Sequence, residues 1–431
     1  MVYLLYDLAL CLSALVLVPY YLLRGLRYGK TRRGIRERLG WFGPTQLDVI
    51  AGRRVIWIHA VSVGETRAAI PLIRALRQRY PDAALVLSNV TETGRAIARE
   101  LREVDLCLFF PFDLSWAVRR VLRQVKPSLV LIVETELWPN FLRQLRRNRV
   151  PVLLVNGRFS DRSFPRYYRG RRVFQPLLKM LTAFCMQSQQ DARRARRIGA
   201  PSELVHVTGN LKFDVAAKIP DAKGRQLLRE KLRLPDDVPI WVAGSTHAGE
   251  EELATRICRE LFVAELPQLL ILVPRHPERC RLIGETLNGQ GISWALRSEI
   301  GGRQEPMRAG EVLLVDTIGE MLDFYAVADL VFVGGSMVPV GGHNILEASL
   351  LRKPVLFGPH MQNFKDIGAL VLKCGGGFQV TTEADLKRRI EQLLLDPLLA
   401  REIGAHGFQL LAEHAGATAR TLDIIQGVWE T

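Results

Sequence analysis

The sequence predicts an α/β protein built from two doubly wound domains, each around a parallel sheet. From residue 54 onward, short apolar runs alternate with amphipathic segments, which is typical of strands covered by helices on both faces. The alternation runs through two cycles, and 431 residues are too many for one ordinary core. A polar, proline-containing stretch at residues 218–239 separates the cycles and is the expected interdomain linker.

The expected elements follow one another regularly in each cycle. In the first cycle we expect strands at residues 54–60, 84–89, 129–134 and 152–156, and a helix at 66–80 whose Ile70, Ile73 and Leu76 share one stripe. In the second cycle we expect strands at residues 240–244, 269–274, 312–315, 330–333 and 354–357. The predicted domains are therefore residues 28–217 and 240–431, preceded by a separate N-terminal segment at 1–27.

The N-terminal segment has the composition of a membrane anchor. Residues 2–23 are almost wholly apolar, with Asp7 as their one charge, and about 20 such residues span a bilayer. Seven basic residues follow between 24 and 38, which places the body of the protein in the cytoplasm and the basic run against anionic lipid headgroups. An interfacial helix is the alternative, because Asp7 and Pro19 interrupt the segment.

Overall composition narrows the class of partner. The net charge of +15 favours an anionic partner, either a phosphorylated substrate, an acidic membrane surface or nucleic acid. The basic run is accounted for by the lipid surface, so no polybasic groove with interleaved aromatic residues need be invoked. We therefore expect no nucleic-acid partner. The six cysteines have no short paired spacing, which predicts neither a zinc site nor a disulfide framework and fits a reducing compartment.

A glycine-rich loop is the strongest single indication of a ligand. Residues 334–347, GGSMVPVGGHNILE, join an apolar strand to a helix, and such a loop leaves N–H groups unpaired at the N-terminus of the helix, where an anion can bind. Asn344 precedes the helix, and Glu347 in its first turn can accept hydrogen bonds from a ribose. We therefore predict a nucleotide site, the alternative being an ordinary strand-to-helix turn.

Other polar clusters stand where the expected strands end. They read HAVSVGE at residues 59–65, ETELWPN at 134–140, GNLKFD at 209–214, GSTHAGEEE at 244–252, LVPRHPER at 272–279 and DTIGEM at 316–321. Carboxyl ends of parallel strands carry ligand sites, so the two domains are expected to face a cleft that holds the substrates.

In this order, and behind an N-terminal anchor, these motifs resemble the bacterial 3-deoxy-D-manno-octulosonic acid (Kdo) transferases of lipopolysaccharide synthesis. The resemblance implies the GT-B architecture of two Rossmann-like domains. It also implies inverting transfer of Kdo from CMP-Kdo to the lipid A precursor at the bacterial inner membrane, with the catalytic body on the cytoplasmic side. No cofactor is expected, and no metal, because the sequence has no Asp-any-Asp pair.

The resemblance also implies residue roles. Glu65 would be the general base, and Glu134 and Lys212 would stabilise the transition state. The CMP contacts implied in the same way are Pro274, Arg275, Ile318, Gly319, Glu320, Asn344, Ile345, Leu346 and Glu347. We leave His247 and His276 out of the catalytic set, because isolated histidines are more often structural.

Each role has a structural alternative. Glu65 can be a helix N-terminal charge, Glu134 an ion-pair partner that shares its place with Glu136, and Lys212 a solvated cation. The sequence departs from the usual family motifs at two places. Residues 88–94 read SNVTETG in place of a TxTxTG-like string, and Ala-Ser follows Glu347 in place of Pro-Ala. These departures bear on the detailed acceptor and loop assignments, not on the class of enzyme. The rival functions are a GT-B enzyme that uses a nucleoside diphosphate sugar and a non-catalytic, membrane-anchored nucleotide-binding protein.

Overall fold

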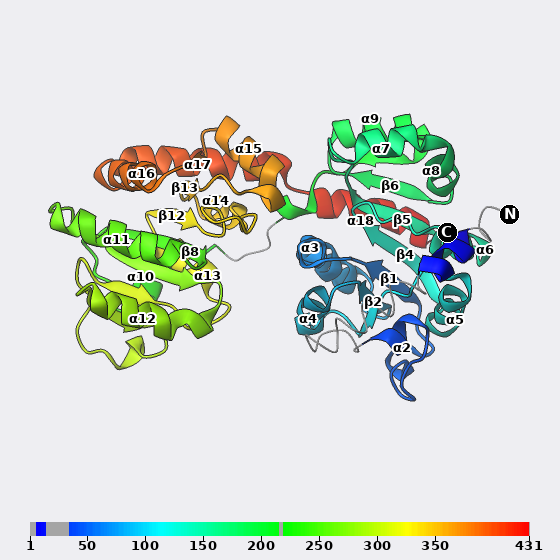
Figure 1. Ribbon diagram of the computed structural model, residues 1–431, viewed down its shortest axis with the longest axis horizontal. Helices are drawn as coiled ribbons and strands as arrows, with labels where there is room; N and C mark the ends of the chain where they lie inside the picture. The colour runs from blue at the N-terminus through cyan, green and yellow to red at the C-terminus, as the bar shows by residue number, and fades with distance from the viewer. Residues whose placement is uncertain (1–5, 14–33, 215–218, 431) are drawn as a thin grey trace. The chain divides into compact units, whose positions relative to one another are not determined.

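The computed structural model describes residues 6–13, 34–214 and 219–430. Contacts between residues divide the chain into two compact units, the first comprising Met1–Asp214 with Ala415–Thr431 and the second Val215–His414. In the described part of the chain each unit holds one seven-stranded sheet, and every strand pairing is parallel (Figure 1). The predicted α/β class with two parallel sheets is confirmed.

The first sheet reverses its strand order in the middle. Its strands are β1 (Val55–His59), β2 (Ala84–Asn89), β3 (Leu106–Phe109), β4 (Pro127–Val133), β5 (Val152–Gly157), β6 (Ala183–Met186) and β7 (Val205–Val207). Their order is β3-β2-β1-β4-β5-β6-β7, so the chain progresses outward in both directions from β1 and β4. Ligands of doubly wound sheets bind beyond the carboxyl ends of the strands at this switch point.

Helices cover both faces of the first sheet. They are α2 (Ile35–Arg38), α3 (Val63–Arg79), α4 (Glu92–Glu100), α5 (Ser115–Val125), α6 (Pro139–Arg147), α7 (Phe164–Arg169), α8 (Arg171–Leu178), α9 (Gln189–Ile198) and α18 (Ala417–Trp429), with 3-10 turns η1 (Asp48–Ile50), η2 (Ser202–Leu204) and η3 (Leu211–Phe213). Two separate apolar clusters form, one on each face of the sheet. The strands therefore lie between two layers of helices, as their unbroken apolar runs predict.

The C-terminal helix belongs to the first unit, whereas the sequence predicts that residues 240–431 form one domain. Trp429 of α18 packs its ring 5.6 Å from that of Tyr80, and the Arg54 guanidinium lies 3.8 Å from the Trp429 ring centroid. Asp214 accepts a hydrogen bond from Gly416 N at 2.7 Å at the start of the helix. The chain thus returns to its first unit because α18 buries apolar surface against α3.

The second sheet has the same plan. Its strands are β8 (Ile240–Thr246), β9 (Leu269–Pro274), β10 (Trp294–Leu296), β11 (Val312–Leu314), β12 (Leu330–Val333), β13 (Val355–Phe357) and β14 (Gly377–Gln379), in the order β10-β11-β9-β8-β12-β13-β14. The switch point lies between β8 and β12. The glycine-rich loop follows β12, so it stands at the predicted ligand-binding edge of this sheet.

The helices of the second unit include one inside the predicted linker. They are α10 (Ala222–Lys231), α11 (Glu250–Val263), α12 (Cys280–Gly289), α13 (Met321–Val327), α14 (Leu346–Leu350), α15 (Lys365–Lys373), α16 (Glu383–Leu395) and α17 (Pro397–His414), with 3-10 turns η4 (Pro277–Arg279), η5 (Ile300–Gly302) and η6 (Gln362–Phe364). Helix α10 packs against α13. Residues 222–231 are therefore part of the second unit and not an extended linker.

The helix after β1 begins three residues earlier than predicted. Ser62 is its N-cap, with an extended backbone, and its side chain accepts a hydrogen bond from Glu65 N. Serine followed three residues later by glutamate is a capping-box pattern, which starts the helix at Val63. Glu65 therefore lies in the first helical turn.

The N-terminal anchor is not confirmed. Residues 2–5 and 14–23 of the predicted segment lie outside the described residues, and the described residues 6–13 are helical. Asp7 accepts hydrogen bonds from Ser115 N at 3.1 Å and from Asn140 Nδ2 at 2.8 Å, so it belongs to the first unit. Among the residues that the structure describes, no helix has the length and apolar character needed to cross a bilayer.

One member of the predicted headgroup-binding run is used inside the protein. Arg38 donates hydrogen bonds to the carbonyls of Phe110, at 3.1 Å, and Val90, and its guanidinium lies 4.5 Å from the Phe109 ring centroid. Its charge is therefore directed at backbone carbonyls and an aromatic face. Residues 24–33 of the run lie outside the described residues.

Candidate active site

The three residues with predicted catalytic roles meet at the carboxyl edge of the first sheet. Glu65 lies in the first turn of α3, just beyond β1, and Glu134 directly follows β4. These two strands pair in parallel, with His59 opposite Ile132, so their ends are neighbours. Lys212 comes from η3, and its Nζ lies 3.9 Å from Glu134 Oε1. The fold brings together side chains that are up to 147 positions apart in the sequence, from 65 to 212.

Two polar side chains hold the Lys212 turn in place. Asn156 at the end of β5 accepts a hydrogen bond from Leu211 N at 3.0 Å, and Asn210 caps the turn by accepting one from Lys212 N at 3.0 Å. On the other side, Asp214 caps α18. The sequence motif GNLKFD thus supplies Lys212 together with the two side chains, Asn210 and Asp214, that fix the turn on either side of it.

The carboxylate of Glu65 is already hydrogen-bonded within its own turn. Its Oε2 accepts from Val61 N at 2.7 Å and its Oε1 accepts from Ser62 Oγ at 2.9 Å. The predicted structural alternative, a helix-capping carboxylate, is therefore present in the geometry. A carboxylate has about four acceptor positions, so each oxygen keeps one lone pair for a substrate proton.

Burial raises the pKa of Glu65 to about 7, against the opposing effect of the Val61 hydrogen bond and with a further increase from the charge of Glu134. A group with this pKa is substantially ionised at neutral pH and still basic enough to accept a proton in the transition state. The capping geometry and a role as base are therefore compatible in one side chain.

Glu134 has an unusual backbone conformation. Its φ of 61° lies in the left-handed region, which costs a non-glycine residue roughly 1–2 kcal/mol. The turn is held by Glu134 N, which donates to Val155 O at 2.9 Å, and by the Thr135 hydroxyl, which donates to the Arg158 carbonyl. A strained residue held by its neighbours at a strand end is characteristic of a functional site.

Glu136 is a third carboxylate of this group, and sequence reasoning assigns it no role of its own. Burial, together with the smaller effects of the Glu65 and Glu134 charges, raises its pKa to about 7. Within the described residues its carboxylate receives no hydrogen bond and no ion pair, in contrast to Glu65 and Glu134. The ETE sequence signals it, because it places a second carboxylate two residues after Glu134 at the same strand end.

In the second unit, a buried carboxylate occupies the start of the glycine-rich loop. Glu250, with 1% of its surface exposed, accepts hydrogen bonds from the backbone N–H groups of Gly335 at 2.7 Å, Ser336 at 3.0 Å and Met337 at 2.8 Å, and from His247 N at 3.0 Å. The sequence predicts an anion site at the N-terminus of the helix that follows the second glycine pair. The N–H groups at the start of the loop, residues 335–337, are not available to such a ligand, because Glu250 of α11 takes their hydrogen bonds.

In the second half of the loop, Asn344 makes two local hydrogen bonds. Asn344 Oδ1 accepts from Leu346 N at 3.2 Å, and its Nδ2 donates to Glu347 Oε1 at 3.0 Å. Ile345 and Leu346 are fully buried, so neither presents surface to a ligand in this structure. Asn344 therefore fixes both the start of α14 and the orientation of Glu347.

The remaining predicted nucleotide contacts lie at neighbouring strand ends of the same sheet. Pro274 ends β9, and Arg275 N donates to Thr246 O of β8 at 2.9 Å. Ile318 and Gly319 follow β11, where Ile318 is 87% exposed and Gly319 has a φ of 93°. The strand order β11-β9-β8-β12 places these segments beside the glycine-rich loop.

Glu320 has protein partners that the sequence does not indicate. Its Oε1 lies 2.7 Å from Arg297 Nη2 and 3.8 Å from Lys231 Nζ, and Thr317 Oγ1 donates to its Oε2 at 2.5 Å. These groups together hold the pKa of Glu320 below its usual value although burial opposes them. Glu320 therefore anchors the segment after β11 in addition to its predicted ligand contact.

Three histidines gather at the same edge. His247 Nε2 lies 2.9 Å from His343 Nε2 with the two rings stacked, and the His276 ring centroid lies 5.8 Å from that of His247. Burial lowers the pKa of His247, so this imidazole is neutral at physiological pH. The described residues contain no group of three or more metal-binding side chains with suitable geometry.

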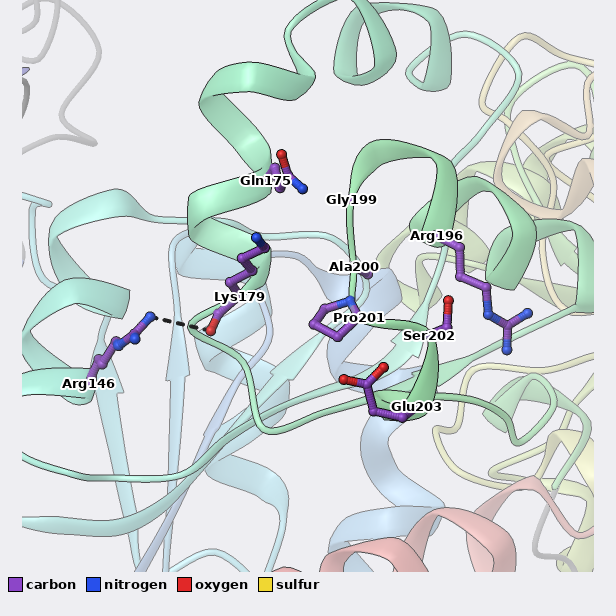
Figure 2. Close-up of a pocket in the computed structure, with 9 residues that line it drawn as sticks. All are labelled: Arg146, Gln175, Lys179, Arg196, Gly199, Ala200, Pro201, Ser202 and Glu203. Carbon is purple, nitrogen blue, oxygen red and sulfur yellow. Dashed lines mark hydrogen bonds between the residues drawn. The ribbon is translucent and has the colours of Figure 1, made fainter.

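A separate open depression lies at the opposite edge of the first sheet (Figure 2). It has a volume of about 670 Å³ and is lined by Arg146, Gln175, Lys179, Arg196 and residues 199–203. These residues precede β5, β6 and β7, at the amino ends of the strands. Arg146 donates to the Lys179 carbonyl at 3.4 Å across one side of it. None of the predicted site residues lines this depression.

Comparison with known proteins agrees with the motifs. The family model described as 3-deoxy-D-manno-octulosonic-acid transferase (kdotransferase) matches residues 33–215. The chain is 34% identical over 397 residues to a 3-deoxy-D-manno-octulosonic acid transferase of Haemophilus influenzae, covering 92% of this chain and 91% of that one. It is 35% identical over 380 residues to the corresponding transferase of Bordetella pertussis, covering 86% of each.

Among solved structures, the UDP-GlcNAc 2-epimerase from Neisseria meningitidis bound to UDP-GlcNAc is similar with a TM-score of 0.56 and 13% identity, covering 87% of this chain and 100% of that one. At that identity the likeness concerns the fold alone, which is of the GT-B type. The two transferases, in contrast, are similar in sequence over most of their length. The chain therefore belongs to the 3-deoxy-D-manno-octulosonic acid (Kdo) transferase family and is a glycosyltransferase.

Proposed function

We propose that the protein transfers Kdo from CMP-Kdo to the lipid A precursor (lipid IVA), with inversion at the anomeric carbon and with Glu65 as general base. Family membership supports the transfer of Kdo. The observation that carries the base assignment is the half-buried Glu65 carboxylate, with a pKa raised to about 7, beside Glu134 and Lys212.

In the proposed reaction, the Glu65 carboxylate takes the proton of an acceptor hydroxyl. The hydroxyl oxygen then forms a bond to the anomeric carbon of Kdo from the face opposite the nucleotide. The bond between that carbon and the phosphate oxygen of CMP breaks, and its electron pair leaves with CMP. One bond to the anomeric carbon forms as another breaks, which accounts for the inversion.

Lys212 and Glu134 are proposed to manage the charge of the transition state. The Lys212 ammonium supplies a positive charge that offsets the negative charge developing on the departing phosphate. Glu134, 3.9 Å away, holds the ammonium in position, and its own carboxylate favours the positive charge that develops on the sugar ring.

The second unit is proposed to bind the donor nucleotide. Arg275 would contact the phosphate, and Glu347, oriented by Asn344, would accept hydrogen bonds from the ribose. The exposed Ile318 and the backbone of Gly319 would face the base. Because Glu250 occupies the N–H groups of residues 335–337, the phosphate contact is assigned to Arg275 and the turn at residues 341–345.

We also propose that the protein works at the cytoplasmic side of the bacterial inner membrane, where its lipid acceptor is embedded. The apolar segment at residues 2–23 and the basic run that follows it support this location.

The test is CMP release from CMP-Kdo by the purified full-length protein, measured with and without the lipid A precursor. Release that requires the precursor and yields a Kdo-bearing lipid supports the proposal. A parallel screen with nucleoside diphosphate sugars covers the rival donor class. If the protein binds CMP but transfers from no donor, the catalytic assignment is wrong.

A further inference from the structure

A densely basic surface lies on three helices of the first unit that carry none of the proposed catalytic residues. Residues 158–172 contain six arginines and one acidic residue, Asp161. Helices α7, α8 and α9 pack together (Figure 1). The arginine face, as we name it, consists of Arg166, Arg169, Arg171, Arg172, Arg194 and Arg197, which are exposed apart from the half-buried Arg194.

Aromatic rings hold three of these guanidinium groups in place. Arg197 lies 5.3 Å from the Phe164 ring centroid and 5.0 Å from that of Tyr168, Arg171 lies 4.8 Å from Tyr168, and Arg194 lies 5.3 Å from Phe164. Such contacts restrict the side chains but leave the planar edges of the exposed Arg171 and Arg197 available to a ligand. A guanidinium edge matches a phosphate with two parallel hydrogen bonds, so the face is organised in advance for that group.

The loop beneath the arginine face is fixed to helix α9. Phe159 N donates to Asp191 Oδ1 at 2.8 Å, and Arg194 Nη1 donates to Phe159 O at 2.6 Å. The side chain of Arg194 also pairs with Asp161, the one acidic residue of the stretch. One arginine is thus largely neutralised, and the mutual repulsion of the others favours an anionic ligand.

The arginine face begins at the same sheet edge as the catalytic carboxylates. Helix α7 follows β5, which is the neighbour of β4, and Glu134 follows β4. Tyr167 of α7 packs its ring 5.3 Å from that of Phe159 and 4.7 Å from that of Phe174. The charge of Glu136 also contributes, after burial, to a raised pKa of Tyr167, which places α7 within electrostatic range of the acidic group.

We propose that the arginine face binds phosphate groups of the amphipathic acceptor, so that an acceptor hydroxyl is presented to Glu65. This rests on the proposed function, and it assigns part of the acceptor site. The exposed Val173, with 65% of its surface accessible, adjoins Arg172 and offers an apolar contact that a lipid can use. In this proposal the arginine side chains bind the phosphate of the acceptor. Because the arginine face begins at the sheet edge that carries Glu65, the acceptor sugar is directed toward that carboxylate.

The experiment compares phosphorylated and enzymatically dephosphorylated acceptor in neutral detergent micelles. The variant is Arg171→Glu with Arg197→Glu, in the full-length protein. Loss of two charged hydrogen-bond donors should raise KM for the phosphorylated acceptor about tenfold or more, with kcat within about twofold. With the dephosphorylated acceptor, variant and wild type should have equal KM. Arg171→Lys with Arg197→Lys should lie in between, because lysine keeps the charge but not the planar fork.

Arg123→Glu with Arg259→Glu is the matched control, since it changes the net charge equally at two exposed arginines outside the arginine face. Control kinetics should equal those of the wild type. An unchanged KM in the Arg171 and Arg197 variant, or an equal rise with both acceptors or in the control, would overturn the proposal.

Two further measurements separate acceptor binding from catalysis and from adhesion to the membrane. Binding of each variant to labelled acceptor micelles, measured without CMP-Kdo, tests the arginine face even if the wild type shows no transfer and the proposed function fails. Flotation on phosphatidylglycerol vesicles that lack the acceptor should be equal for wild type and variant. A matching loss of flotation would assign the face to membrane headgroups and remove the acceptor assignment.

Discussion

Lys212 Nζ lies 3.9 Å from Glu134 Oε1, and Glu134 holds this position with a left-handed backbone, φ 61°. The lysine comes from a turn after β7, whereas the glutamate comes from the end of β4. The ion pair therefore joins two strand ends that are separated by β5 and β6 in the sheet. A strained residue that reaches across a sheet edge to a cation makes Lys212 the first side chain to test.

Lys212→Ala should lower kcat by roughly 100-fold or more, because removing one transition-state donor typically costs that much. Its affinity for CMP should fall much less than kcat, since every residue of the predicted nucleotide set belongs to the second unit and Lys212 acts on the charge that develops as the phosphate departs. Single-turnover transfer and calorimetry with CMP measure the two effects. Equal activity in Lys212→Ala and wild type would show that Lys212 does not stabilise the transition state and serves only as an ion-pair partner of Glu134.

Glu65→Gln should reduce transfer by roughly 100- to 10,000-fold, the usual contribution of a general base, and leave CMP binding nearly unchanged. Glutamine can still complete a capping box, so α3 should keep its first turn. Circular dichroism checks the fold, and a radiolabelled Kdo transfer assay checks the chemistry. Substantial turnover by a correctly folded Glu65→Gln protein would show that another group accepts the proton.

The pH dependence of activity should follow the raised pKa values of Glu65 and Glu136, both about 7. A base works in its ionised form, so kcat/KM should rise with pH through about 7 and then level off. Glu136→Gln removes one neighbouring negative charge and should shift this rise to lower pH. A profile that is flat between about pH 5 and 8 would contradict the assignment of a carboxylate base.

The free energy of unfolding should also depend on the ionisation of Glu136. Activity is expected to rise with pH, whereas the contribution of Glu136 to stability is expected to fall. Burial raises the folded-state pKa of Glu136 from the ordinary 4.5 to about 7, so between these values the folded state binds the proton more tightly. The stability that this proton contributes is present below pH 4.5 and is lost as pH rises through about 7. Glu136→Gln should therefore raise Tm at about pH 8 more than at about pH 5. Equal shifts at both pH values would mean that Glu136 is not buried as described.

Glu250→Ala should destabilise the second unit by about 2–5 kcal/mol, because the N–H groups of residues 335–337 lose their buried acceptor. CMP affinity should fall as a consequence, since the loop that carries Asn344 loses its support. Thermal unfolding and CMP calorimetry measure the two effects. Glu252→Ala, which removes an exposed hydrogen bond from Gly249 N in the first turn of the same helix, is the control and should cost less than about 1 kcal/mol.

Glu347→Ala and Arg275→Ala should each weaken CMP binding by about 1–3 kcal/mol, the cost of leaving a charged hydrogen-bond partner unmatched. Asn344→Ala should weaken it as well, because Asn344 orients Glu347. Calorimetry with CMP provides the measurement. Wild-type affinity in both Glu347→Ala and Arg275→Ala would place the nucleotide elsewhere.

Much of the fold follows from local sequence. The long apolar runs that become β1, β2, β4, β5, β8 and β9 are buried on both faces of a parallel sheet, so their pattern alone identifies them. Strands of three or four residues are too short to show a periodicity, so sequence detects them unevenly. The sequence predicts β11, β12 and β13 but misses β3, β6, β7, β10 and β14, which are equally short. Strand ends followed by glycine and acidic residues likewise locate the polar clusters.

Tertiary structure decided how those clusters are used. Nothing near Lys212 in the sequence indicates that it approaches Glu134, since the pairing depends on the strand order of the whole sheet. The loop at residues 334–347 has the composition of an anion site, yet a glutamate 85 positions before Gly335 takes its first N–H groups. The return of α18 to the first unit depends on apolar burial against α3, a long-range contact that no local pattern encodes. Local sequence determined the elements and their polar ends, and packing between distant segments determined which polar groups are left for a substrate.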